Sequence, residues 1–196
     1  MLTFTHATMG AGKSAILIAK ATSVLDHAIV LKPRMDSRDG LDKVSSRNGA
    51  SLSCLLLDNP GDYTKTLIFL NKLVEEITWR TKRAVRFIFI DEAQFLTEEE
   101  VNALLTFSLE SDIIIECYGL LTDFKTNLFE GSKRLIEVAD NIEHLVSYSR
   151  DGNIAKHNAR FIDGEMVTEG ETVMLGKEEA YKALSNKEYF GGKINE

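Results

Sequence analysis

The sequence predicts an α/β protein with a mainly parallel sheet flanked by helices, followed by a small β-rich C-terminal unit. Three observations support this prediction. Short β-type segments alternate with segments of helical periodicity, a turn ending in Gly-Lys-Ser follows the first of them, and a pair of acids follows a later one. In such sheets, ligands bind beyond the carboxyl ends of the strands.

The individual elements follow from hydrophobic periodicity. Apolar or β-branched runs predict strands, and apolar residues that recur every three to four positions predict helices. Thr97 with Glu100 three residues later forms a capping-box pattern, so a helix is expected to begin there. In chain order, strands are expected over 2–4, 28–31, 51–57, 85–90 and 113–118, and helices over 15–21, 62–79 and 97–109.

Two segments depart from this alternation. Residues 34–49 are polar, carry charges of both signs and lack periodicity, which predicts a long mobile loop. After about residue 146, short β-type runs over 159–162 and 172–175 are joined by turns at Asp163-Gly164 and Glu169-Gly170. We therefore expect a nucleotide-binding domain over 1–145, a small β-rich domain over 146–190 and a tail over 191–196.

Composition narrows the class of protein. With 196 residues, of which 44% are hydrophobic, the chain can form one globular domain with a small appendage. No apolar run has the length of a membrane span and no signal-peptide pattern is visible, so we expect a cytoplasmic protein. The net charge of −7 argues against a general nucleic-acid binder, which would need a basic face. Cys54 and Cys117 lie in apolar surroundings, which favours buried free thiols over a disulfide.

Residues 7–14 read A-T-M-G-A-G-K-S and stand between the first expected strand and the first expected helix. A small-residue turn ending in Gly-Lys-Ser at this place is typical of P-loop nucleoside triphosphatases, whose backbone N–H groups cradle phosphates. Lys13 can reach the β- and γ-phosphates, and the Ser14 hydroxyl can bind Mg²⁺. Ala7 replaces the first glycine of the pattern, so an ordinary turn at a helix N-terminus remains the alternative. The nucleotide-binding residues expected in this turn are Met9, Gly10, Ala11, Gly12, Lys13 and Ser14.

Asp91 and Glu92 follow directly after the strand expected over 85–90. In phosphate-loop enzymes the acid at the tip of such a strand holds Mg²⁺, which is the role expected for Asp91. Glu92 can then face an acceptor and take a proton from its hydroxyl as a general base. The alternative is that both acids only solvate a strand end. Arg38 can cover transferring phosphates, or it can be an ordinary solvated arginine.

These motifs resemble, in order and spacing, the type II thymidine kinases, and most closely their bacterial and phage branch. The matching segments are A-T-M-G-A-G-K-S, K-P-R-M-D-S-R, V-S-S-R-N-G, D-E-A-Q-F-L, and Y-G-L-L-T-D-F with L-F-E-G-S. They cover nearly the whole chain, from Leu2 to about Phe190. The resemblance implies Mg²⁺-dependent transfer of the γ-phosphoryl group of ATP to the 5′-hydroxyl of thymidine, and also of deoxyuridine. It further implies a homotetramer and feedback inhibition by thymidine triphosphate (dTTP).

The resemblance also implies roles for individual residues. Lys13 and Ser14 would bind phosphates and Mg²⁺, Asp91 would support the metal, and Glu92 would be the general base. Asp36 and Arg38 match an Asp-x-Arg pair near the phosphates. The C-terminal unit matches a lasso domain that closes over the nucleoside, with Gly176 and Tyr181 at matching places. The resemblance also implies an apolar, aromatic pocket for thymine. Core packing remains the alternative role for the residues concerned, which are Met9, Phe95, Leu120, Phe124 and Phe129.

One departure from the family concerns zinc. Most of its members carry four zinc ligands in the lasso domain, and here these positions lack cysteine and histidine. Structural zinc prefers exactly those two residue types as ligands, so we expect no structural zinc and a unit held by packing and ligand. The positions concerned are Tyr148 or Ser149, Asp151, Ser185 and Glu188.

Two other functions remain open on the sequence. A phosphate-loop ATPase that works as a motor or switch would hydrolyse ATP without a nucleoside acceptor, and the acidic net charge weighs against it. A catalytically silent nucleotide-binding protein would have lost catalysis together with its zinc site. Against the silent protein, every matched catalytic position is filled.

Overall fold

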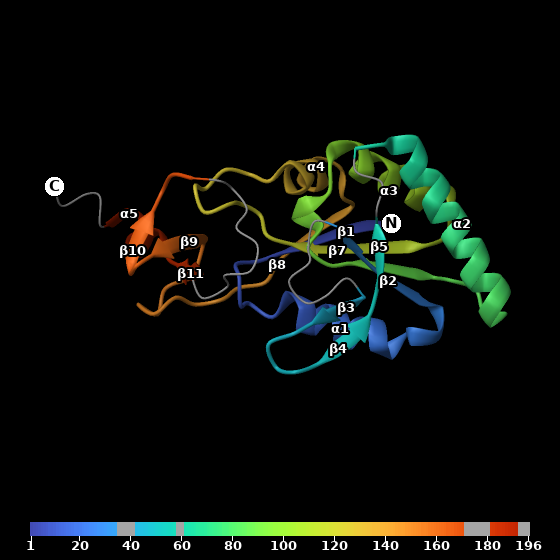
Figure 1. Ribbon diagram of the computed structural model, residues 1–196, viewed down its shortest axis with the longest axis horizontal. Coiled ribbons are helices and arrows are strands. Elements are labelled where there is room, and N and C mark those ends of the chain that lie inside the picture. The colour runs from blue at the N-terminus through green and yellow to red at the C-terminus, as the bar shows by residue number, and fades with distance from the viewer. Residues whose placement is uncertain (35–41, 58–60, 171–180, 192–196) are drawn as a thin grey trace.

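A six-stranded sheet, parallel throughout, forms the centre of the computed structural model, which describes residues 1–34, 42–57, 61–170 and 181–191 (Figure 1). Every neighbouring pair of its strands runs parallel, which confirms the predicted α/β class. In spatial order the strands are β5 (Leu55–Leu57), β2 (Ala28–Pro33), β6 (Phe87–Ile90), β7 (Ile114–Gly119), β1 (Leu2–His6) and β8 (Asn141–His144).

Helices cover both faces of the sheet, and each face has its own apolar core. On one face lie α2 (Tyr63–Thr81), α3 (Glu98–Glu110) and α4 (Glu130–Val138), and on the other lies α1 (Lys13–Ser23) (Figure 1). Leu104 of α3 and Ile88 of β6 belong to the first core, while Leu17 of α1 and Phe89 of β6 belong to the second. Alternate residues of β6 therefore face opposite layers, as the two-residue period of a strand requires.

Local sequence explains where the helices of the first layer begin. Thr97 caps α3, since its side chain accepts a hydrogen bond from the backbone of Glu100, and the Glu100 side chain accepts one from the backbone of Thr97. The predicted capping box is therefore confirmed. The Asp62 side chain caps α2 by accepting a hydrogen bond from the backbone N–H of Lys65. Each cap satisfies a donor that a free helix end would leave unpaired.

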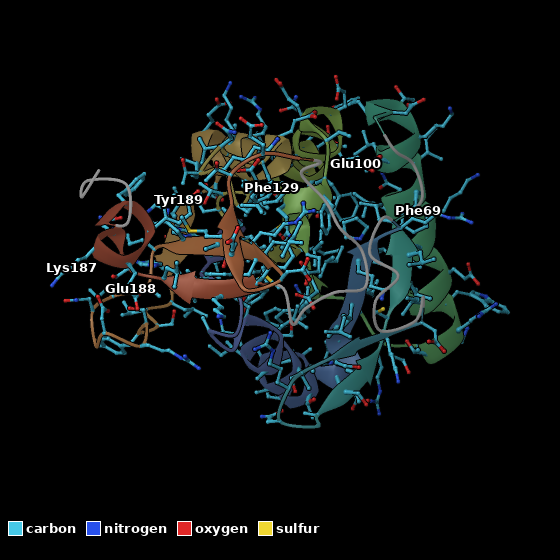
Figure 2. All side chains as sticks on the ribbon, turned by 60° about the vertical axis from the view of Figure 1, so that its left-hand side comes forward. Phe69, Glu100, Phe129, Lys187, Glu188 and Tyr189 are labelled. Carbon is cyan, nitrogen blue, oxygen red and sulfur yellow. The ribbon has the colours of Figure 1, made fainter. Side chains whose placement is uncertain are left out.

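The C-terminal unit is a small antiparallel sheet with one short helix. The strands β10 (Glu165–Val167), β9 (His157–Ile162) and β11 (Tyr181–Leu184) lie side by side in that order, and α5 (Asn186–Gly191) follows. The turn between β9 and β10 lies at Asp163-Gly164, as predicted, and both residues have positive φ angles of 51° and 89°. Glu188 and Tyr189 belong to α5 at the far end of this unit (Figure 2).

The structure corrects several predictions. The prediction of one long loop over 34–49 is wrong for its last part, because β3 (Lys43–Ser45) pairs antiparallel with β4 (Ser51–Ser53). The predicted strand over 51–57 is two strands, since Cys54 separates β4 from β5. Neither α4 nor β8 was predicted from the sequence. The strand predicted over 172–175 lies outside the described residues.

Both cysteines are buried and neither forms a disulfide, as predicted. None of the described helices is long and apolar enough to cross a membrane.

Candidate active site

The turn between β1 and α1 has the geometry of a phosphate loop. Gly10 and Gly12 adopt φ angles of 76° and 89°, in the left-handed region that side chains disfavour. Gly12 immediately precedes α1, so the first turn of that helix points its unpaired N–H groups at the loop. Lys13 is buried, and its Nζ donates to the carbonyl oxygens of Ala7 (3.3 Å) and Thr8 (2.9 Å).

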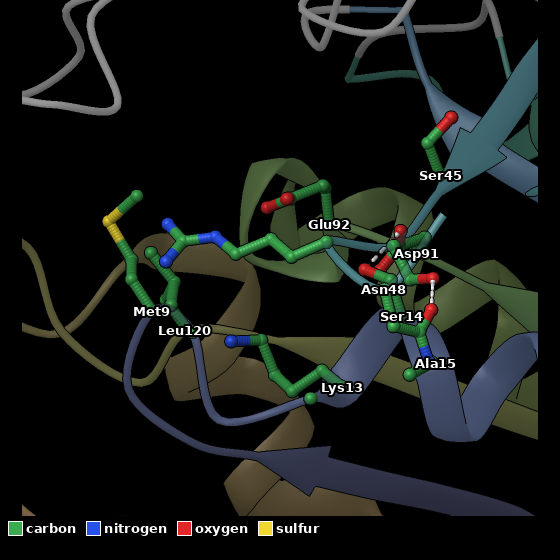
Figure 3. Close-up of a pocket in the computed structure, with 13 residues that line it drawn as sticks. Met9, Lys13, Ser14, Ala15, Ser45, Asn48, Asp91, Glu92 and Leu120 are labelled. Carbon is green, nitrogen blue, oxygen red and sulfur yellow. Dashed lines mark hydrogen bonds between the residues drawn. The ribbon is translucent and has the colours of Figure 1, made fainter. Parts of the chain in front are cut away.

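Asp91 lies at the carboxyl end of β6 and faces the start of α1. The Ser14 hydroxyl donates a 3.0 Å hydrogen bond to Asp91 Oδ2 (Figure 3). Burial, with the neighbouring charge of Glu92 as the second cause, raises the pKa of the Asp91 carboxyl to about 7. The Ser14 hydrogen bond and the Lys13 charge oppose that rise in pKa. A cation at this position would relieve the same unfavourable burial of negative charge.

This pair of oxygen donors suits magnesium. Mg²⁺ binds carboxylate and hydroxyl oxygens together with the phosphates of its nucleotide, in preference to dedicated all-protein cages. Ser14 and Asp91 are therefore the residues that fit the metal expected at a phosphate loop. Within the described parts of the chain, there is no group of three or more His, Cys, Asp or Glu side chains that could hold a metal by themselves.

Glu92 follows Asp91 and is held by Gln94. Its backbone is left-handed, with φ 51° and ψ 38°, which turns the chain sharply at the end of β6. The Gln94 Nε2 donates to Glu92 Oε2, and the Gln94 Oε1 accepts a 3.0 Å hydrogen bond from the backbone of Leu120. Gln94 is buried, and a Cβ at Gly119 would lie 2.8 Å from its Oε1. The fit between Gln94 and the end of β7 thus fixes the place of the Glu92 carboxylate.

One cavity joins these groups. Its volume is about 300 Å³, and the phosphate loop, the two acids and residues of the β3–β4 hairpin line it (Figure 3). Arg47 comes close to the loop, since its Nη1 would lie 3.1 Å from a Cβ at Gly10. The lining residues are Met9, Gly10, Gly12, Lys13, Ser14, Ala15, Ser45, Ser46, Arg47, Asn48, Asp91, Glu92 and Leu120.

Eight of the sixteen site residues expected from sequence line this cavity. Ala11 belongs to the phosphate loop without lining the cavity. Phe95 and Phe129 contact each other edge to face, with ring centroids 6.0 Å apart. Phe124 is buried beneath the Arg160 guanidinium, which lies 5.1 Å from its ring centroid. Tyr181 lies on β11 opposite Arg160. Asp36, Arg38 and Gly176 lie outside the described residues.

Two features of the candidate site were not predicted from the sequence. The first is the run Ser45, Ser46, Arg47 and Asn48, which belongs to the matched motif V-S-S-R-N-G but had no expected role. A short run of serine and arginine between glycines is also common in solvated loops, so it does not by itself indicate a site. The second is Gln94 in D-E-A-Q-F-L. Its position depends on a hydrogen bond from the backbone of Leu120, which is 26 residues away in the chain.

The C-terminal unit and the segment that leads to it contact the back of the phosphate loop. The backbone N–H of Met9 donates a 2.7 Å hydrogen bond to Oδ1 of Asn158 on β9. The hydroxyls of Thr8 and Ser147 lie 2.6 Å apart. The loop is therefore held between α1 on one side and residues of the last quarter of the chain on the other.

A strand, a glycine turn with a buried lysine, a serine at the helix start and an acid at the tip of a nearby strand define a P-loop nucleotide-binding protein. Comparisons with known proteins agree. The sequence model of the family described as "Thymidine kinase" matches residues 1–189. The thymidine kinase of Enterobacteria phage T4 is 34% identical over 193 residues, which are 96% of this chain and 94% of that protein.

A thymidine kinase of Haemophilus influenzae is 33% identical over 193 residues, which cover 96% of this chain and 95% of that kinase. Among solved structures, the Pif1 helicase of Candida albicans has a TM-score of 0.44 at 16% identity, over 74% of this chain and 35% of the helicase. The chain belongs to the thymidine kinase family, and its function is that of a P-loop kinase of this family.

Proposed function

We propose that this protein transfers the γ-phosphoryl group of ATP to the 5′-hydroxyl of thymidine, and of deoxyuridine, and releases ADP and the nucleoside monophosphate. The observation that carries the proposal is the position of Glu92. Its carboxylate lines the same cavity as the phosphate loop, and Gln94 holds it. A simple hydrolase would need only a group to orient water, whereas this position suits a base for a bound hydroxyl.

Phosphate binding is assigned to the loop and to Arg47. The backbone N–H groups of the loop and the start of α1 face the cavity, and Lys13 supplies a buried positive charge there. The Lys13 ammonium would exchange its carbonyl partners, Ala7 and Thr8, for phosphate oxygens. Arg47 adds a second cation to this wall of the cavity, and a guanidinium suits phosphate oxygens in a bidentate geometry.

Ser14 and Asp91 would hold Mg²⁺. When bound, the ion neutralises charge on the β- and γ-phosphates. Glu92 accepts the proton of the 5′-hydroxyl as that oxygen forms its bond to the γ-phosphorus, and the bond to the β–γ bridging oxygen breaks with its electron pair leaving on ADP. Gln94 keeps the Glu92 carboxylate oriented toward the cavity.

The nucleoside is assigned to the apolar side of this region. Met9 and Leu120 line the cavity next to the acids, which places apolar side chains beside the proposed base. Phe95 and Phe129 form an aromatic pair, and a flat pyrimidine ring fits such a slot. Family resemblance adds Phe124, Tyr181, Gly176, Asp36 and Arg38 to the proposal, together with lasso closure by a domain over 146–190 behind a kinase domain over 1–145.

A zinc-free C-terminal unit is also part of the proposal. Three of the positions that resemblance assigns to zinc are linked by hydrogen bonds. The Ser185 hydroxyl donates to Asp151 Oδ2 (2.8 Å), the Glu188 backbone N–H donates to Ser185 Oγ (3.2 Å), and the Ser185 backbone N–H donates to Glu188 Oε2 (3.0 Å). Un-ionised hydroxyls are not the ligands of structural zinc, so this donor set does not fit the metal.

These hydrogen bonds tie α5 and the end of β11 to the segment around Asp151, which is where a metal clip would act. Elemental analysis of the purified protein tests this part of the proposal. We expect no stoichiometric zinc, and one zinc per chain would contradict it.

The remaining parts of the proposal follow the family. They are a homotetramer in the cytoplasm, feedback inhibition by dTTP, and no nucleic-acid partner. Size-exclusion chromatography with light scattering and inhibition kinetics with dTTP test the first two directly.

A phosphorylation assay with Mg-ATP and four nucleosides tests the central proposal. We expect turnover on thymidine, weaker turnover on deoxyuridine, and none on deoxycytidine or deoxyguanosine. ATP hydrolysis that needs no nucleoside would instead favour a motor or switch. Bound ATP without any turnover would favour a silent nucleotide-binding protein.

A further inference from the structure

A second cavity lies behind the phosphate loop, on the side away from the nucleotide site. Its volume is about 190 Å³, and it shares no lining residue with the cavity that contains Lys13 and Glu92. Ala7 and Thr8 form one wall, so the phosphate loop separates the two spaces. The ends of β1 and β8 and the beginning of the C-terminal unit supply the other walls.

Two histidines stack at the edge of this cavity. His6 ends β1 and His144 ends β8, and the parallel register places them side by side. Their rings are nearly parallel, with an interplanar angle of 13° and centroids 4.9 Å apart. Neither imidazole has a hydrogen bond within the described parts of the chain, so their ring nitrogens can turn to a ligand as donors or acceptors.

The other polar groups of the cavity are mainly donors. Lys156 lines it and forms no ion pair with any described carboxylate. Asn158 is buried, and because its Oδ1 accepts from Met9, its Nδ2 is the group with capacity left for a ligand. Thr122 adds a hydroxyl. Among the residues that line the cavity there is no Asp or Glu, although the whole chain carries a net charge of −7.

The groups that shift the pKa of His6 are consistent with a cavity lined by hydrogen-bond donors and no carboxylate. Its pKa is lowered to about 4, first by burial and then by the nearby His144, Lys13 and Lys156, all of which are cations or can become cations. No carboxylate offsets them among the groups that act on His6. The cavity thus carries the positive charge of Lys156 and no lining carboxylate, and an anion bound there would lower the free energy of that charge.

We propose that this cavity binds a small phosphate-type oxyanion, either free phosphate or the phosphate group of a small phosphomonoester. Lys156 supplies the charge, while His6, His144, Thr122 and Asn158 supply hydrogen bonds from several directions. A tetrahedral oxyanion has acceptors in all these directions and fits a space of about 190 Å³. The site stands apart from the proposed kinase chemistry, and the proposal does not depend on it.

Proton NMR of the histidine rings tests the proposal with its own internal controls. The chain has four histidines, so the resonances can be assigned with single His→Gln variants. The probe is inorganic phosphate, added while a non-hydrolysable ATP analogue with Mg²⁺ saturates the phosphate loop. We expect the signals of His6 and His144 to shift in a saturable way and those of His27 and His157 to stay.

Two variants separate this site from surface attraction. Lys156→Gln should weaken phosphate binding by about fivefold, which is the size of one partly screened ion pair. The matched control is Lys187→Gln on α5, an exposed lysine at the far end of the C-terminal unit (Figure 2), and it should bind phosphate as wild type does. Equal effects of the two variants would overturn the proposal.

A second arm identifies the source of the phosphate group. Methyl phosphate is titrated in the same way, and shifts at His6 and His144 would assign the site to phosphomonoesters as well as to free phosphate. Shifts with inorganic phosphate alone would assign it to the free ion. If neither anion shifts these two signals, or if the ATP analogue abolishes the shifts, the proposal is wrong.

Discussion

The Ser14 hydroxyl and the Asp91 carboxylate lie 3.0 Å apart, although 77 residues separate them in the chain. The first begins α1 and the second ends β6, so the hydrogen bond joins the phosphate loop to the tip of the neighbouring strand. Burial of Asp91 next to Glu92 raises the pKa of the Asp91 carboxyl to about 7. The geometry thus places two acidic side chains beside a loop whose shape suits phosphates.

Replacing the proposed base separates binding from chemistry. Glu92→Gln keeps the size of the side chain and removes the carboxylate that would accept the proton. We expect kcat for thymidine to fall about 10²- to 10⁴-fold, the usual contribution of a general base. The dissociation constant for Mg-ATP, measured by calorimetry, should stay within about twofold. Near-normal kcat would remove Glu92 from the role of base.

In the proposed mechanism Gln94 is a positioning residue, because it acts through Glu92. Gln94→Leu has a similar volume and removes both hydrogen bonds, the one to Glu92 and the one from the Leu120 backbone. We expect kcat to fall about 10- to 100-fold with little change in KM for ATP, since a misplaced catalytic group affects the transition state. Combined with Glu92→Gln, the Gln94→Leu change should cause little further loss. Additive losses would contradict a role through Glu92.

Arg47 is expected to bind the nucleotide through its charge. Arg47→Gln removes a cation from the wall of the cavity, and we expect KM for Mg-ATP to rise about tenfold, the equivalent of one charge-assisted hydrogen bond. The matched control is Arg80→Gln on α2, which breaks an exposed ion pair with Glu76 and should leave KM unchanged. Equal KM values for wild type and Arg47→Gln would place the phosphates elsewhere.

The helix α4 approaches the turn after Glu92 so closely that its glycine is required. A Cβ at Gly131 would lie 2.4 Å from the carbonyl oxygen of Leu96 and 2.8 Å from that of Ala93. We expect Gly131→Ala to lower the free energy of unfolding by about 1–3 kcal/mol, as overpacking does. Gly191→Ala in α5 is the control, because nothing lies within 4 Å of its Cβ position. Urea unfolding of both variants compares them.

The hydrogen bonds to Asp151 should make the stability of the C-terminal unit depend on pH. Ser149 and then Asn153 hold the pKa of the Asp151 carboxyl well below its usual range. A carboxyl with a lowered folded-state pKa stabilises the fold above its unfolded pKa of about 3.9, and this contribution is lost as the pH falls below that value.

Asp151→Asn should therefore lower the Tm at pH 7 and change it less at pH 3. The matched control is Asp163→Asn in the β9–β10 turn, for which we expect no such pH-dependent difference. A Tm difference between Asp151→Asn and wild type that is the same at both pH values would contradict the prediction.

The sequence predicted the parts of the fold that depend on local pattern. The phosphate loop, the acids after β6 and the capping box of α3 can be read from neighbouring residues, because each is defined by a few adjacent positions. The strand β8 was missed because all four of its residues are exposed, so they carry no apolar alternation. The hairpin β3–β4 was missed because its residues are mostly polar and its turn resembles a loop.

The same distinction applies to the site. Lys13, Ser14, Asp91 and Glu92 could be predicted as candidate site residues because they stand at fixed places relative to strands and helices. Gln94 and Arg47 gain their positions from contacts with residues far along the chain, Leu120 and Gly10. Local spacing in the sequence holds no information about such long-range contacts.

The left-handed backbone of Glu92 has a consequence for protein engineering. A residue other than glycine in this region costs about 1 kcal/mol, and the buried carboxylate beside it is a further source of instability. Directed evolution for heat resistance alone would therefore favour glycine at position 92 and a neutral side chain at position 91. Screening such libraries by survival at high temperature would select against the residues proposed as base and metal ligand, so turnover has to be part of the selection.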